Sequence, residues 1–277
     1  SPYYDDFNES KKFHRILFRP SFAVQARELT QSQSILQNQV EKISDHLFEK
    51  GAMVIPGEIG YNINYYAVKL TSFTDSAAVG LTLADFNNLQ LTGQTSGVVA
   101  KVINFVVTDG TDPNTLYVQY ETSGTSNTST KFTAGETISV ATTLQGTATT
   151  VSAVVDSCST GAAAYVAAGT YYINGFHVDV AEQTIILDKY TNTPSYRIGL
   201  LVTESFVTSN DDTSLNDNAQ GTSNVNAPGA HRFKIDLTLA KLTEDSTADS
   251  SFVELFRLKN GKLQNRPVSD VRTSIED

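Results

Sequence analysis

The spacing of apolar residues divides the chain into a helical start and a much longer remainder. From about residue 24 to residue 50, apolar positions recur every three or four residues. This period predicts one amphipathic helix, roughly 35–40 Å long at about 1.5 Å per residue. Glu28 in the first turn, Lys50 in the last turn and Gly51 directly after it are typical of helix ends.

Beyond Gly51 the apolar period changes to two, which predicts strands. Asn174-Gly175 and Asn260-Gly261 each stand between alternating segments and predict tight hairpin turns, because a type I′ turn needs positive φ at both central residues. Residues 71–80 are small and polar, which predicts a linker. Residues 208–230 are also polar and predict a long loop.

These patterns predict an α+β fold that is predominantly β. A long N-terminal helix, self-associating and coiled-coil-like, should be followed by antiparallel β-sandwich or β-barrel domains. The expected division is a docking segment over residues 1–70 with the helix (24–50) and the first strand, a small inserted β-barrel or sandwich over 71–160, and a β-rich C-terminal domain over 161–277.

Counted in sevens, the helix presents one apolar seam with a single polar member: Ala26, Leu29, Gln33, Leu36, Val40, Ile43 and Leu47. The seam could pack on the sheet of its own chain, or it could meet copies of itself about a symmetry axis. A spacing near 3.5 favours the second interpretation, and copies of Gln33 could hydrogen-bond across the axis. We therefore predict that these seven residues form an oligomer interface.

The residues beside the seam carry no fixed charge, so like helices could approach each other without repulsion: Thr30, Ser32, Gln37, Gln39, Ser44 and His46. Burying apolar side chains of the seam would contribute about 1.5–3 kcal/mol each, which would offset the marginal stability of an isolated helix.

Composition narrows the possible functions. The 277 residues include 40% hydrophobic and 18% charged residues, with a net charge of −10. Residues 1–60, 61–160 and 161–277 each hold more acidic than basic residues, so no segment offers the positive charge that nucleic acid requires. No apolar run approaches the roughly 20 residues of a membrane helix. We expect no nucleic-acid partner and no membrane insertion.

Signatures of catalysis and metal binding are mostly absent from the sequence. The four histidines are isolated, and the single Cys158 is expected to be a small packing residue. Oxygen donors in the 208–230 loop invite a calcium interpretation, but they fail the EF-hand spacing, and turn capping is favoured: Asp211, Asp212, Asp217 and Asn218. We expect no enzyme activity, cofactor or metal.

Two long stretches resemble a family of phage structural proteins. The first runs from YYDDF (3–7) through HRILF (14–18) and Pro20 to AVQARELTQSQSILQNQ (23–39), and the second is LNDNAQGTSNVNAPGAHRFKI (215–235). Both are similar to openings and internal stretches of tail-fibre and baseplate proteins of tailed phages, which are common in phages of cyanobacteria. Ser21 and Ser32 depart from the pattern, in which glycine and a larger apolar residue are expected. Residues 81–155 do not align with it.

The resemblance implies a virion component of the phage tail, made in the host cytoplasm and assembled as a homotrimer that docks to other tail or baseplate proteins. It also implies a joint between chains in the polar loop, where tight turns are set by Asp217, Asn218, Gly221, Asn224, Asn226, Pro228 and Gly229.

Two other functions remain open from the sequence. A receptor-binding or glycan-degrading fibre head would need a groove lined with aromatic residues and carboxylates, for which tyrosines are available: Tyr3, Tyr4, Tyr65, Tyr66, Tyr171 and Tyr172. A monomeric adhesin module of a cell surface is a third candidate. The phage structural protein would be an oligomer, whereas the adhesin module would be a monomer.

Overall fold

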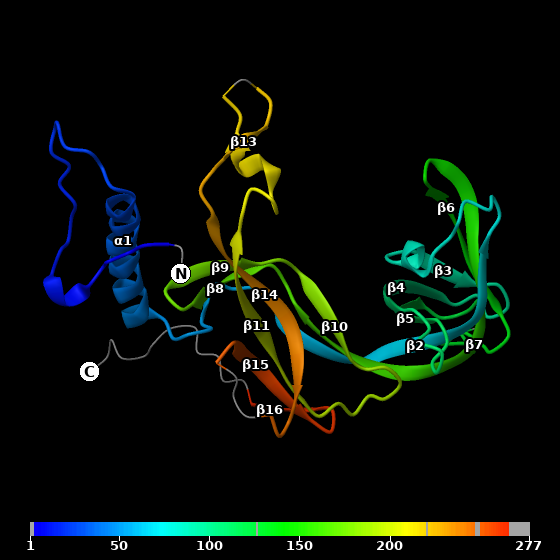
Figure 1. Ribbon diagram of the computed structural model, residues 1–277. Helices are drawn as coiled ribbons and strands as arrows, with labels where there is room; N and C mark the ends of the chain where they lie inside the picture. Colours follow the sequence, from blue (N-terminus) through cyan, green and yellow to red (C-terminus); the bar gives the residue numbers. More distant parts are fainter. Residues whose placement is uncertain (1–2, 126, 220, 247–249, 266–277) are drawn as a thin grey trace.

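A computed structural model describes residues 3–125, 127–219, 221–246 and 250–265 (Figure 1). The helical elements are α1 (Ala26–Leu47) and three short 3₁₀ turns, η1 (Glu9–Lys11), η2 (Leu83–Phe86) and η3 (Thr213–Leu215). The strands are β1 (Met53–Ile55), β2 (Ile59–Asp75), β3 (Gln90–Gly93), β4 (Val99–Val106), β5 (Thr115–Thr122), β6 (Thr137–Leu144), β7 (Thr147–Val166), β8 (Gly169–Ile173), β9 (Phe176–Val180), β10 (Gln183–Asp188), β11 (Tyr196–Val207), β12 (Asn216–Asp217), β13 (Asn224–Pro228), β14 (Arg232–Thr243), β15 (Phe252–Lys259) and β16 (Lys262–Asn265).

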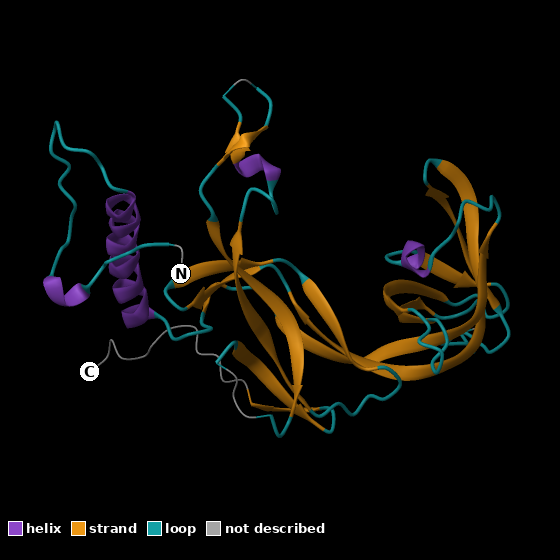
Figure 2. Cartoon of the chain, viewed as in Figure 1, coloured by secondary structure: helices purple, strands orange, loops and turns teal. Residues whose placement is uncertain are grey.

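The α+β assignment is wrong. The chain is mostly β, and its strands are arranged in several antiparallel sheets (Figure 2). Of the residues that the structure describes, 49% lie in strands and 12% in helices. Within the described residues α1 is the one helix longer than a single turn, and it forms no coiled coil. The expectation gave too much weight to one amphipathic segment, whereas most of the apolar patterns after Gly51 have the period of a strand.

The helix itself lies close to its predicted bounds of 24–50. At its start, a carboxylate oxygen of Glu28 accepts a hydrogen bond from the Gln25 backbone N–H at 2.8 Å, which completes a capping box. Gly51 adopts φ +87°, but it lies four residues beyond Leu47 and does not cap the helix. Its N–H donates to the Tyr172 carbonyl at 2.7 Å, so it fixes the junction between α1 and the sheets.

One hydrophobic core lies where three sets of strands meet. It joins the sheet β1-β8-β9, the first part of β2 with the last part of β7 and β10, and the sheet β14-β11-β15-β16. Its fully buried residues include Tyr171, Ile198, Leu200 and Leu255. We call this unit the body.

A second core lies inside a closed ring of strands, the barrel unit (residues 76–155 with the adjoining part of β2). The pairings run β7-β2-β5-β4-β3-β6 and return from β6 to β7. Phe86, Leu91, Leu116 and Ile138 are fully buried inside it. Because the ring closes, these strands leave no free edge.

The long strands β2 and β7 connect the two cores. They pair antiparallel from Ile59↔Val166 near the body to Asp75↔Val151 in the barrel unit (Figure 1). Residues 71–75 therefore belong to a strand, whereas a linker was expected over 71–80. The expected domain boundaries, after residues 70 and 160, fall inside these two strands. The small polar residues at this end of β2 show no strand pattern in the sequence. The strand forms because the backbone groups of β2 and β7 hydrogen-bond to each other whatever the side chains.

Both predicted hairpin turns are confirmed. Asn174 and Gly175 have φ values of +46° and +89° between β8 and β9, and Asn260 and Gly261 have +50° and +73° between β15 and β16. Positive φ at both central residues matches the right-handed twist of the flanking strands. The β8–β9 hairpin also supports α1, because side chains of the helix hydrogen-bond to it.

Candidate interface on helix α1

The N-terminal segment holds α1 on one side. Asp6 receives a hydrogen bond from Gln31 at 3.2 Å and an ion pair from Arg27 at 3.4 Å. Glu9 pairs with Lys42 near the other end of the helix, and the hydrogen bond from Lys42 lowers the pKa of Glu9. These polar contacts come from residues more than twenty positions apart in the sequence, so the helical period gave no sign of them.

The β8–β9 hairpin holds α1 on a second side. Gln37 donates to the Gly175 carbonyl at 2.7 Å, and the Tyr172 hydroxyl donates to the Asp45 carboxylate at 2.6 Å. Burial and then this bond raise the pKa of Tyr172. Ser44, which is 3% exposed, lies 3.1 Å from a ring nitrogen of His177. The helix is thus fixed to the body mainly through its C-terminal half.

These contacts revise the interpretation of the neutral flanks. Gln37 and Ser44 bond to the body, and Thr30 and Ser32 donate to carbonyls of their own helix at 3.2 Å and 2.7 Å. Four of the six uncharged positions are therefore explained within one chain. Polar groups that must be buried against a sheet need hydrogen-bond partners, and the neutral amide and hydroxyl groups find them here.

The third side of α1 has no partner among the residues that the structure describes. Four apolar side chains, which we call the stripe, are exposed: Leu29 (55%), Leu36 (67%), Val40 (47%) and Ile43 (65%). Ala26 and Gln33 of the predicted seam are exposed as well, and Leu47 is half-buried. The seam is therefore not packed on its own sheet. Its role as an oligomer interface stays a prediction, because the structure contains a single chain.

The position of Ile35 explains how the helix can leave the stripe open. Ile35 lies outside the seam and is only 3% exposed. It borders a small cavity of about 300 Å³ together with Phe7 and Phe13 of the N-terminal segment. At about 100° of rotation per residue, Ile35 and Ser44 point to opposite sides of α1, and the stripe lies on the face between them.

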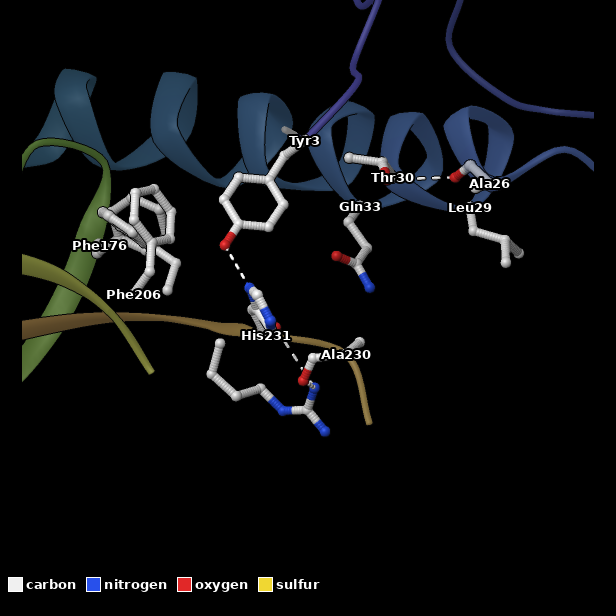
Figure 3. A pocket seen from close by; sticks show the side chains of 11 residues that line it. Tyr3, Ala26, Leu29, Thr30, Gln33, Phe176, Phe206, Ala230 and His231 are labelled. Carbon is white, nitrogen blue, oxygen red and sulfur yellow. Dashed lines mark hydrogen bonds between the residues drawn. The ribbon is translucent and has the colours of Figure 1, made fainter. Parts of the chain in front are cut away.

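A cleft of about 820 Å³ lies beside the first half of the stripe (Figure 3). Leu29 and Gln33 line it from α1, and Phe176, Phe206 and Phe233 line it from the ends of β9, β11 and β14. The aromatic rings contact each other, with centroids 5.7 Å apart for Phe176–Phe233 and 5.8 Å for Phe206–Phe233. Phe206 and Phe233 are 57% and 45% exposed.

Tyr3 closes one wall of this cleft. Its ring centroid lies 5.0 Å from that of Phe206, and its hydroxyl is within hydrogen-bond distance of the His231 ring (Figure 3). Among the described residues, the lining of the cleft contains no Asp or Glu and consists of Tyr3, Ala26, Leu29, Thr30, Gln33, Phe176, Phe206, Ala230, His231, Arg232 and Phe233. The chemistry of this cleft therefore suits an apolar contact better than acid–base catalysis.

Exposed apolar surface is concentrated at the N-terminal end of the chain. Among the described residues, 11 of the 18 large hydrophobic side chains that are exposed lie between Tyr3 and Ile43. Besides the stripe they include a segment before the helix, with Phe13, Leu17, Phe18, Phe22 and Val24 between 52% and 78% exposed. Exposed apolar side chains that gather in one part of a protein commonly mark contacts with other proteins.

The predicted joint loop forms a projecting hairpin, residues 208–230, whose strands β12 and β13 pair at Asn216↔Pro228 and Asp217↔Asn224. Side chains cap its turns as expected: Asp217 accepts from the Ala219 N–H and Asn224 from the Asn226 N–H, each at 3.1 Å. Backbone hydrogen bonds close the other turns. The Gly221 N–H donates to the Asn218 carbonyl at 2.8 Å, and the Gly229 N–H donates to the Leu215 carbonyl at 2.9 Å. Its contact with another chain stays a prediction.

Other candidate chemistry from the sequence finds less support. Of the tyrosines proposed to line a groove, Tyr65, Tyr171 and Tyr172 are at most 6% exposed. Cys158 of β7 is half-buried against the core of the barrel unit, and burial raises the pKa of its thiol. In the described part of the chain, no three His, Cys, Asp or Glu side chains are grouped so that they could hold a metal ion.

No helix in the described ranges is both long enough and apolar enough to cross a membrane. The geometry defines a class of protein: a mostly β chain whose barrel unit is closed and whose single long helix, within the described residues, exposes an apolar face.

Comparison with protein families places the chain more narrowly. It belongs to a family described as a domain of unknown function (DUF4815), whose model matches residues 1–156 and 146–274. The match includes residues 81–155, which the motif resemblance had left unaligned. No curated protein and no solved structure matches the chain.

The structure also bears on one departure from the motif pattern of the phage-protein resemblance. Ser21, where glycine was expected, adopts φ +70° in the turn before α1. This left-handed conformation is costly for residues with a Cβ and is the usual reason for glycine at a turn. The expectation of glycine at this position therefore has a physical basis in the backbone of this chain.

Proposed function

We propose that this protein is a structural component of a phage tail, in a tail fibre or baseplate, and that it assembles as a homotrimer and docks to other tail proteins. The phage assignment is supported by the motifs at residues 3–39 and 215–235. The assembly is supported by one observation above all, the exposed stripe on α1. The further docking is supported by the apolar surface outside the stripe.

The energy available from the stripe decides how much surface an assembly needs. Complete burial of a Leu, Ile or Val side chain contributes about 1.5–3 kcal/mol. Because the four stripe residues are about half exposed, covering them contributes roughly 3–7 kcal/mol per copy. Association costs about 4–15 kcal/mol in lost freedom. The stripe alone is therefore marginal, and a stable trimer must cover further surface such as the aromatic cleft or the segment before α1.

The assembly is tested by the mass of the protein in solution, measured by light scattering after size-exclusion chromatography. The wild type should have three times the 30.0 kDa of one chain. The variant Leu36→Asp with Val40→Asp should have the mass of one chain, because charges on the stripe would have to be desolvated at the contact. An unchanged mass of the variant at the oligomer value contradicts the proposed interface.

The control replaces the same two residue types elsewhere. Val107 and Leu263 are 58% and 45% exposed and lie in the barrel unit and the body. The variant Val107→Asp with Leu263→Asp should keep the mass of the wild type. Circular dichroism should show the same strand content in all three proteins, because stripe and control positions are both exposed.

The phage assignment needs a separate test. Peptides of this chain should be found by mass spectrometry in purified tailed-phage particles that encode it, and antibodies against the barrel unit should label the tail in electron micrographs. Absence from purified particles contradicts the assignment even if the protein is a trimer. A monomer in solution contradicts the assembly even if the protein is present in particles.

A further inference from the structure

Two segments extend toward the same end of the molecule. The arm, residues 10–25, passes beyond the N-terminal end of α1, and the projecting hairpin, residues 208–230, rises above the sheets of the body (Figure 1). Most of their side chains are exposed. Their charges are opposite, and neither segment pairs its charges within the described chain.

The arm is basic and apolar. It contains no Asp or Glu and four cationic side chains, Lys11, Lys12, Arg15 and Arg19. Within the described residues none of the four forms an ion pair, and Arg19 instead lies over the ring of Phe22 at 4.9 Å. The apolar side chains Leu17, Phe18 and Phe22 are 78%, 53% and 64% exposed on the same segment.

The projecting hairpin is acidic. It contains Asp211, Asp212 and Asp217 and no Lys or Arg. Hydrogen bonds from Thr208 lower the pKa of Asp211, and those from Ser214 lower the pKa of Asp212, so both carboxylates are ionised at neutral pH. In the described ranges these three carboxylates form no ion pair. Near the hairpin tip, Val225 is 74% exposed.

We propose that in the assembled protein the arm of one copy lies on the projecting hairpin of the next copy. Arg15 and Arg19 would face Asp211 and Asp212, and apolar arm side chains would cover Val225. This contact rests on the homo-oligomer proposed above, and it supplies surface that the stripe alone lacks.

Symmetry favours this arrangement. A contact between two different surfaces of the same chain is heterologous, and around a threefold axis it closes into a ring that uses every arm and every hairpin once. Both segments extend beyond the same end of α1 (Figure 1), so rotation about an axis parallel to α1 would bring the arm of one copy to the level of the hairpin of the next. Charges at the rim of a contact contribute mainly to specificity and register, and salt weakens them.

The contact is tested by exchanging charges. The arm variant is Arg15→Glu with Arg19→Glu, the hairpin variant is Asp211→Lys with Asp212→Lys, and a third protein combines all four changes. Sedimentation equilibrium gives the self-association constant at about 50 mM and about 500 mM salt. Each variant should self-associate about tenfold more weakly at low salt, and the combined protein should recover most of the loss. The differences should shrink at high salt.

Two control variants test for loss of the turn hydrogen bonds and for a general effect of net charge. Lysines at 211 and 212 cannot accept the bonds from Thr208 and Ser214, so Asp211→Asn with Asp212→Asn removes the charge and keeps an acceptor. It should weaken association in the same direction. The variant Lys101→Glu with Lys262→Glu changes net charge as much as the arm variant, outside both segments, and should leave association unchanged.

The outcomes separate this contact from the proposed function. An oligomer that neither the arm nor the hairpin variant weakens overturns the contact and leaves the homo-oligomer standing. Weakening by the arm variant alone also overturns it and indicates that the arm meets another surface. If the combined protein self-associates no more strongly than the more weakly associating of the two single-segment variants, the proposed pairing is wrong. A monomeric wild type overturns the contact together with the homo-oligomer.

Discussion

The N-terminal region, residues 3–47, exposes many of its apolar side chains, whereas the barrel unit buries most of its own. The N-terminal region exposes eleven large hydrophobic side chains, whereas among the described residues of the barrel unit only Val107 is exposed to that degree. The barrel unit closes on itself through the β6–β7 pairing, so its apolar side chains share one interior. The comparison teaches that one region is complete as a single chain and the other is not.

The difference follows from the number of layers. A sheet that closes into a ring provides both walls of its own core. Helix α1 has the N-terminal segment on one side and the β8–β9 hairpin on another, but within the described residues no element covers the stripe. A second layer for this face must come from outside the described chain, and a second copy is the occupant that we propose.

The largest expected effect lies in the barrel core. Phe86 is fully buried and packs edge to face on Phe73 with ring centroids 5.8 Å apart. Phe86→Ala should lower the free energy of unfolding by about 3–5 kcal/mol, measured by urea denaturation. Leu36→Ala on the stripe should change it by no more than about 0.5 kcal/mol in dilute monomer. Equal losses for both variants would remove the contrast between the two regions.

A smaller effect is expected at a buried carboxylate in the same unit. Glu136 is 4% exposed and accepts hydrogen bonds from the backbone N–H groups of Ser96 at 3.0 Å and Thr133 at 2.5 Å. Glu136→Ala would leave these donors unpaired and should cost about 1.5–3 kcal/mol in urea denaturation. Glu121→Ala, at an exposed acid of the same unit, serves as the control. If Glu136→Ala lowers the free energy of unfolding no more than Glu121→Ala does, water takes the place of the carboxylate as hydrogen-bond acceptor.

The smallest effect concerns one exposed carboxylate. Backbone hydrogen bonds from Asp112 and Thr111, more than the contact with Lys189, lower the pKa of Asp109 to about 2. A lowered pKa means that Asp109 stabilises the fold above its unfolded pKa and that this contribution is lost as the pH falls toward 2. NMR titration should place its midpoint near 2, and Lys189→Ala should move it little. A midpoint near the ordinary 3.8 would show that the turn does not hold these bonds.

Local features of the fold could be predicted from the sequence. The Asn174-Gly175 turn and the helix over 26–47 depend on neighbouring residues, because positive φ and a repeating apolar face are set within a few positions. The stripe is exposed in the described chain, and its role as an oligomer interface stays a prediction. Its partner cannot be read from one chain.

Features that depend on distant residues could not be predicted. The length of β2 was missed because four of its last five residues are small and polar and pair with β7, about 80 positions away. The aromatic cleft was missed because Tyr3 meets Phe206 and His231 across more than two hundred residues. The helix contacts of Gln37 and Ser44 were hidden in the same way, and they account for neutral positions that had been assigned to a partner helix.

One signal of the further contact was present in the sequence. The absence of acidic residues from 10–25 and of basic residues from 208–230 is visible without a structure. Summing charge over residues 1–60 concealed it, because Asp5, Asp6 and Glu9 balance the arm. Charge counted in windows of about fifteen residues would have found both segments, although only the fold shows that they extend toward one end.

The most direct measurement is cross-linking between identical positions of the stripe. Identical residues approach each other only near a rotation axis, so Val40→Cys should form a disulfide between two chains on mild oxidation. Non-reducing electrophoresis should then show a covalent dimer for Val40→Cys and single chains for the exposed control Val107→Cys. If Val40→Cys remains a single chain under conditions in which the wild type is an oligomer, the stripe does not lie at the axis.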